Sequence, residues 1–176
     1  MLKNTNMESR DMTLTYDSNK HGYDPRTFHS LLDKKGAALV VATTSDSQIV
    51  GGYNPKGWVG LGEYRGSVAA FLFYFSDDSD RPTKLRKVGG AGLAQVDNPE
   101  SAVSFGVDSL VINMNGGSSM ASSKLGSYYE RLESGQNTIF RTGKATARLK
   151  ELKIYTGVYE DGEYIPFSDA EPFALN

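Results

Sequence analysis

Residues 51–75 read GGYNPKGWVGLGEYRGSVAAFLFYF. A glycine-rich stretch at 54–66 carries a single acidic residue, Glu63, and leads into the apolar run 67–75. Three interpretations of this pattern are possible: a phosphate-binding loop, a catalytic acid on a glycine hinge, or a loop between two core strands with a packed tryptophan. Each interpretation predicts a different fold and a different candidate site.

The glycine spacing argues against a phosphate-binding loop. Gly60, Gly62 and Gly66 do not form a GxGxxG motif, and no Gly-Lys-Ser/Thr sequence follows them. A nucleotide-binding loop also opens a helix, whose N-terminal N–H groups bind the phosphate. Here β-branched and aromatic residues follow, so the stretch is predicted to connect two strands.

Strand patterns surround this loop on both sides. AALVVAT (37–43) predicts a buried strand, and QIVGGY (48–53) returns after a short turn, so the two are expected to form a hairpin. The run 67–75 is apolar on both faces, as in a central strand that is covered on both sides. TKLRKV (83–88) is expected to pair next, and its charges suit a solvated sheet edge.

Further strands are predicted toward the C-terminus, at 92–96, 102–106 and 108–114. The segment KATARLKELKIYTGVY (144–159) alternates strongly between apolar and polar residues. Its apolar residues shift from odd to even positions near Lys150–Glu151, which predicts a β-bulge or bend in one long strand.

One short amphipathic helix is predicted ahead of the strands. Asp24 suits the N-cap, Pro25 suits the first helical position, and Gly36 supplies the stop. Many short strands with few helices predict an α+β, mainly β fold. We expect two packed antiparallel sheets, a β-sandwich, flanked by short helices.

The chain length fits one domain. Residues 1–20 are polar and are expected to form a flexible lead-in, and residues 21–159 are expected to form the domain. Residues 160–176 form an acidic tail with spaced aromatic residues, which is expected to wrap the domain or reach a partner.

Composition and charge exclude several classes of function. The 176 residues carry 19 basic and 21 acidic side chains, a net charge of −2, which argues against nucleic-acid binding. The absence of cysteine excludes disulfides, thiolate metal sites and thiol redox catalysis. The longest apolar run is far shorter than the ~20 residues of a spanning helix. Without a signal-peptide pattern, a soluble, cytoplasmic protein is expected.

Glu63 is the acid of greatest interest, because it lies between Gly62 and a strand that is expected to be buried. On a strand it would share a face with Arg65, and burial would raise its pKa unless a partner kept it ionised. It is either an acid/base or partner-binding group, or a carboxylate that orders the loop by accepting backbone N–H bonds. Trp58 is either a binding anchor or a plug packed on the sheet.

The sequence contains no clear motif for a metal site or for a hydrolase active site. His21 and His29 have no nearby paired carboxylate and make a poor metal site, so surface or capping roles are expected. Asp77, Asp78 and Asp80 lack the spacing of an EF-hand loop and are expected to be solvated. The sequence has no Gly-x-Ser-x-Gly elbow. We therefore expect no metal and no cofactor.

Several short motifs follow one another in a familiar order. They are TFHSLL (27–32), ALVVAT (38–43), QIVGGY (48–53), GLGE (60–63), SVAAFLF (67–73), SFGVDSLVI (104–112) and LKELKIYTGVY (149–159). Together they resemble the TLDc domain of oxidation-resistance proteins over about residues 21–159. FGVDS and the loop 115–127 depart from the family pattern. The GWVGLGE variant looks most like plant or protist relatives, some with calcium-binding EF-hands upstream, so the chain is compatible with being a piece of such a protein.

The resemblance implies two packed antiparallel sheets and a link to protection against oxidative stress. Several family members bind the vacuolar-type proton ATPase, and the domain has no agreed enzymatic reaction. By motif, the family's recurring glycines and acid correspond to Gly51, Gly52, Gly60, Gly62 and Glu63 of this chain.

Two functions are left open. The first is a non-enzymatic interaction domain whose partner is plausibly the vacuolar-type proton ATPase; the alternative is an acid/base or hydrolase-like enzyme centred on Glu63. A concave pocket that holds Glu63 beside a second titratable group would favour the enzyme. A flat surface with Glu63 bonded to backbone would favour the interaction domain. A homodimer is also left open.

Overall fold

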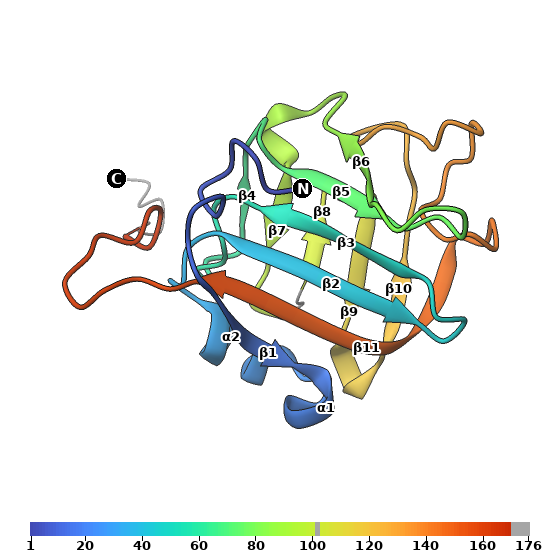
Figure 1. The fold of residues 1–176 in the computed structure, drawn as a ribbon. Helices are drawn as coiled ribbons and strands as arrows, with labels where there is room; N and C mark the ends of the chain where they lie inside the picture. The colour runs from blue at the N-terminus through green and yellow to red at the C-terminus, as the bar shows by residue number, and fades with distance from the viewer. Residues whose placement is uncertain (101–102, 170–176) are drawn as a thin grey trace, which may run out of the picture.

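The computed structural model describes residues 1–100 and 103–169, which form two antiparallel β-sheets packed face to face (Figure 1). The front sheet of Figure 1 contains β1 (Met12–Asp17), β11 (Thr146–Gly157), β2 (Ala38–Thr44), β3 (Ile49–Asn54), β5 (Phe71–Tyr74) and β6 (Thr83–Arg86). The back sheet contains β4 (Glu63–Arg65), β7 (Gln95–Asp97), β8 (Val103–Phe105), β9 (Leu110–Asn113) and β10 (Met120–Ser122). The predicted mainly β fold is confirmed.

Strand β11 belongs to both sheets and forms the corner between them. Its first residues, Thr146–Arg148, pair with β10 of the back sheet. The register then shifts between Leu149 and Glu151, and the rest of the strand pairs with β2 and β1 of the front sheet. A strand that changes sheets at a bulge is a common way to turn such a corner. The bulge predicted near Lys150–Glu151 is confirmed.

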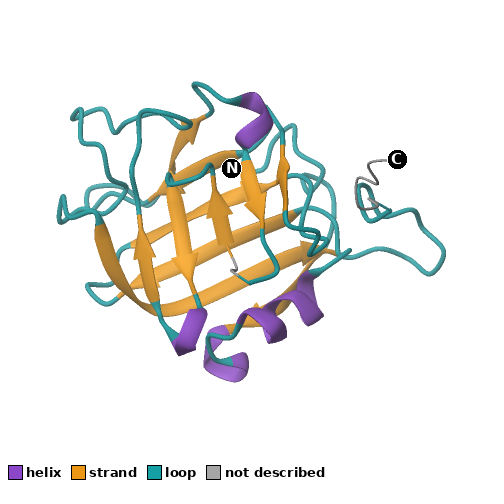
Figure 2. Ribbon diagram, turned by 180° about the vertical axis from the view of Figure 1, so that it is seen from behind, coloured by secondary structure: helices purple, strands orange, loops and turns teal. Residues whose placement is uncertain are grey.

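Short helices cover one end of the sandwich (Figure 2). They are α1 (Ser18–His21) and α2 (Pro25–Leu32), with the 3₁₀ turns η1 (Ala91–Leu93) and η2 (Asn115–Gly117) elsewhere. Asp24 is the N-cap of α2, since its Oδ2 accepts a hydrogen bond from Thr27 N at 2.8 Å. The helix ends at Leu32, four residues before the predicted stop at Gly36, and Asp33 is its C-cap.

The main core lies between the sheets. Apolar side chains from both sheets and from α2 meet there with almost no exposure, among them Phe28, Val40, Leu72, Phe105 and Ile154. The predicted hairpin of β2 and β3 is confirmed, with Ala42 opposite Val50 in register. This core fixes the strands on which the candidate site residues lie.

The prediction that residues 1–20 form a flexible lead-in is wrong. Residues 12–17 form β1, which pairs along β11, and the Tyr16 side chain is buried in the core. The physical reason is that the strand carries no regular core-facing pattern, because Met12 and Leu14 are exposed and a register shift separates them from the buried Tyr16. The C-terminal tail contacts the N-terminal segment, since Glu163 forms an ion pair with Arg10. Residues 170–176 of the predicted tail lie outside the described residues.

The stretch 54–75 also differs in detail from its prediction. The predicted loop contains the short strand β4, which pairs with β7. The apolar run forms a strand only at Phe71–Tyr74, and Val68 is 81% exposed. No helix in the described part of the chain is long and apolar enough to cross a membrane.

Candidate functional site

Trp58 lies inside the molecule rather than on its surface. Its side chain is 2% exposed and packs edge-to-face on Phe28, with ring centroids 5.0 Å apart. Its backbone carbonyl accepts a hydrogen bond from Lys34 N at 2.8 Å. Trp58 therefore has the geometry of a plug that joins the glycine-rich loop to the end of α2.

Asp97 orders the glycine-rich loop. Its carboxylate is fully buried and accepts hydrogen bonds from Val59 N at 2.9 Å and from Gly60 N at 3.1 Å. The guanidinium of Arg65, itself 5% exposed, lies 3.7 Å from the same carboxylate. The sequence analysis missed Asp97, because the only local signal is an acid at the end of a short strand before Asn98.

Two amide side chains hold the first half of the loop. Asn54 Oδ1 accepts hydrogen bonds from Lys56 N at 3.0 Å and Gly57 N at 2.9 Å, while Gln95 Nε2 donates to Gly57 O at 2.7 Å. Polar groups of a buried loop need such partners, because an unpaired one costs about 1–3 kcal/mol. Side chains of Asn54, Gln95 and Asp97 therefore hold the backbone of the loop along most of its length.

Glu63 does not have the loop-ordering role that the sequence analysis considered for it. It is half-buried on β4, directly opposite Asp97 in the register of β4 and β7. Its side chain has no hydrogen bond or ion pair with any residue that the structure describes. The loop-ordering carboxylate is instead Asp97, on the neighbouring strand.

The four predicted glycines occupy restricted positions. A Cβ on Gly52 would lie 2.6 Å from the Phe105 ring, and one on Gly51 would lie 2.0 Å from a backbone oxygen of β2. Gly60 and Gly62 have φ values of +69° and +73°, which side chains rarely adopt. All four positions thus serve close packing or loop conformation.

The two histidines make local contacts. His29 Nδ1 lies 2.7 Å from Asp33 Oδ1, and His29 Nε2 lies 3.1 Å from the backbone oxygen of Asn98. This side chain joins α2 to the turn after β7. His21 Nδ1 accepts a hydrogen bond from Asp17 N at 3.1 Å. Over residues 1–100 and 103–169, no group of three or more His, Cys, Asp or Glu residues could hold a metal ion.

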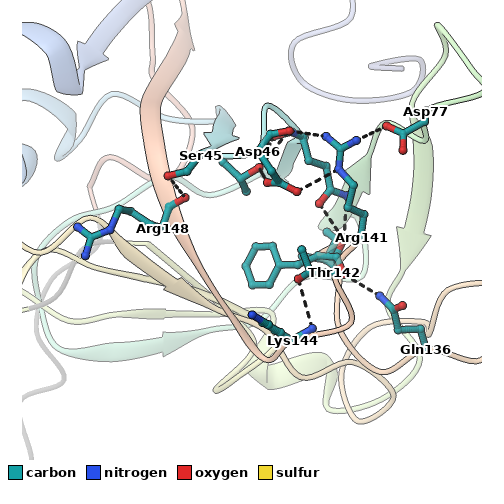
Figure 3. A network of polar contacts seen from close by, with 12 residues as sticks. Ser45, Asp46, Asp77, Gln136, Arg141, Thr142, Lys144 and Arg148 are labelled. Atoms are coloured by element: carbon teal, nitrogen blue, oxygen red, sulfur yellow. Dashed lines mark hydrogen bonds and ion pairs between the residues drawn. The ribbon is translucent and has the colours of Figure 1, made fainter.

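A second polar cluster binds three loops together at the other end of the strands (Figure 3). Arg141 Nε lies 3.2 Å from Asp46 Oδ2, and another guanidinium nitrogen bonds to Asp77. The backbone nitrogen of Arg141 donates to Gln48 Oε1 at 2.8 Å. Asp77 is solvated as expected, with its side chain 70% exposed, and its ion pair with Arg141 also fastens its loop.

The surface next to the glycine-rich loop is apolar and exposed. On β4, Tyr64 is 62% exposed, while its neighbour Glu63, whose side chain lies on the opposite face of the strand, is half-buried. Val68, three residues after β4, is 81% exposed. We call Tyr64 and Val68 the β4 surface. A cavity of about 580 Å³ lies elsewhere, lined by residues of β6 and of the loop at 126–133, among them Lys84 and Arg131.

Comparison with protein-family models identifies the family of this chain. A family model described as the TLDc domain matches residues 1–156 of the chain. No match is found among curated proteins. The matched range includes β1, the whole glycine-rich loop and β4.

Proposed function

This chain belongs to the TLDc domain family of oxidation-resistance proteins, and from that premise we propose that it is a non-enzymatic interaction domain. It acts in the cytoplasm and supports protection against oxidative stress by binding the vacuolar-type proton ATPase. The observation that carries this proposal is the β4 surface, which a rigidly held loop presents to solvent. A rigid loop loses little conformational freedom when a partner binds.

The β4 surface has the composition of a binding site. Exposed aromatic residues such as Tyr64 are enriched at the centres of protein interfaces, where they supply much of the binding energy. Among the described strands, β4 ends the path of the back sheet and pairs with β7. Its second edge pairs with no strand of residues 1–100 and 103–169, and we place a partner's backbone or side chains along it.

The residue chemistry supports a non-enzymatic role over the alternative. An acid/base enzyme centred on Glu63 would need a second titratable group beside it in a cavity. The cavities of about 580, 460 and 420 Å³ are lined by other residues. The carboxylate nearest the loop, Asp97, is occupied by backbone N–H groups. Because the chain has no cysteine, its protective effect cannot use a thiol.

A pull-down from solubilised vacuolar membranes tests the proposal. Wild type, Glu63→Ala and Tyr64→Ala are each checked by thermal melt and used as bait, and the ATPase subunits are detected by antibody. We expect wild type to recover the subunits and the folded Tyr64→Ala variant to recover far less. If wild type recovers none of the subunits, the proposed partner is wrong. Activity on ester, peptide or glycoside substrates that is lost in Glu63→Ala would favour the enzyme.

A further inference from the structure

The outer side of the front sheet is unusually apolar. Strands β2, β3 and β5 carry large apolar residues on the side that faces away from the back sheet. We call this the outer aromatic face; it consists of Leu39, Tyr53, Phe71, Phe73 and Phe75. Tyr53 and Phe71 stack with ring centroids 5.4 Å apart, and Phe73 meets Phe75 edge-to-face at 6.4 Å. A sandwich sheet normally exposes polar residues on this side.

The N-terminal segment covers this face. Residues 1–10, here called the strap, lie in front of the strands in Figure 1 before the chain enters β1. Met7 is 2% exposed and packs in one cluster with the face, and Leu2 packs beside it. The strap explains why 67–75 is apolar on both sides, since the second cover of β5 comes from the chain's own N-terminus.

Few polar contacts hold the strap on the face. Asn6 N donates to the Tyr53 hydroxyl at 3.1 Å. Within the strap, hydrogen bonds run from Thr5 to Leu2 O and from Asn4 N to Glu8. At the end of the strap, Arg10 donates to Val158 O at 3.0 Å and pairs with Glu163, residues that do not belong to the face. Residues 1–9 therefore bind the face chiefly through one buried methionine, a residue that adapts well to exchangeable apolar sites.

We infer that the outer aromatic face is a docking site for a short partner segment with the strap's chemistry, which the strap occupies until that segment replaces it. The segment carries a methionine or leucine as its buried anchor. An acidic residue follows this anchor, as Glu8 follows Met7 in the strap, and the complementary charge comes from Lys84 and Arg86, which stand opposite Phe73 and Phe71 in the β5–β6 register. The site is on the opposite sheet from β4, so this inference is independent of the proposed function.

A peptide-competition experiment on the full chain tests the inference. The probe is a synthetic peptide of residues 1–11, added to isotope-labelled protein and followed by the backbone amide signals of Tyr53, Phe71 and Phe73. The protein to which the peptide is added is the Met7→Asp variant. Its strap leaves the face, because a charged side chain is strongly disfavoured in the apolar site of the buried methionine. Burial of one methionine corresponds to about a tenfold to hundredfold change in occupancy.

We expect saturable shifts of these amides in the Met7→Asp chain. In wild type we expect binding at least tenfold weaker, because the attached strap competes at an effective concentration on the order of millimolar. A peptide with Met7→Leu should bind, and a peptide with Met7→Asp should not. If Met7→Asp fails to fold, Met7→Ala serves as the recipient. Unchanged amide signals in a folded recipient, or equal binding to wild type, would overturn the inference.

Discussion

Replacing Asp97 is the sharpest test of how the glycine-rich loop is ordered. Asp97→Ala removes the acceptor of the Val59 and Gly60 N–H groups and leaves the buried Arg65 guanidinium without its carboxylate. Removing one partner of a buried ion pair costs about 3–5 kcal/mol. Folded domains have a free energy of unfolding of about 5–15 kcal/mol, so we expect Asp97→Ala to remove about a fifth or more of the stability.

Urea denaturation measures this loss. At a slope of about 2–3 kcal/mol per molar urea, the unfolding midpoint of Asp97→Ala should fall by about 1–2.5 M. Glu63→Ala is the matched control on the paired strand, and it should change stability by no more than about 0.5 kcal/mol. The second change Arg65→Met in the Asp97→Ala background should recover part of the loss, since it removes the unpaired charge. Equal losses in Asp97→Ala and Glu63→Ala would refute this reasoning and return the loop-ordering role to Glu63.

Two other predictions follow from local geometry. Gly52→Ala should lower stability by about 1–3 kcal/mol, because its methyl group would overlap the Phe105 ring; an unchanged thermal melt would contradict the close approach. A hydrogen bond from the Thr44 hydroxyl, with a smaller effect of Arg141, lowers the pKa of Asp46 below its ordinary value of 3.8. Because the pKa is lower in the folded state, the Asp46 carboxylate stabilises the fold above about pH 4 and loses this effect as the pH falls through the folded pKa. Asp46→Asn should therefore melt below wild type at pH 7 and together with it near pH 2, whereas a constant gap would contradict the assignment.

Elements with a long, regular pattern were predictable from the sequence. The β2–β3 hairpin, α2 with its Asp24 cap, and the bulged strand β11 all follow from local periodicity and capping chemistry. Local patterns succeed there because the side chains that decide each element are close together in the chain. Strand β1 was missed because it is short and its burial depends on pairing with β11, more than a hundred residues later.

The candidate site was less predictable, because it depends on contacts between distant segments. The position of Glu63 among glycines made it the candidate for ordering the loop. The carboxylate that binds the loop is instead Asp97, on the adjacent strand. Trp58 could be a plug or an anchor until the position of Phe28 was known. The apolar residues on both sides of β5 predicted that both sides are packed against other segments. Nothing in the sequence indicated that the strap packs on the outer side.

Binding to the purified vacuolar-type proton ATPase tests the proposed function most directly. Immobilised wild type, Tyr64→Ala and Tyr164→Ala are compared by interferometry; Tyr164 is the matched control, since it is 64% exposed against 62% for Tyr64 but lies in the tail. We predict saturable binding by wild type and Tyr164→Ala. Tyr64→Ala should bind about thirtyfold more weakly, as expected for a hot-spot residue worth about 2 kcal/mol. No binding by the folded wild type, or equal affinity for all three proteins, would contradict the assignment of the β4 surface as the ATPase-binding site.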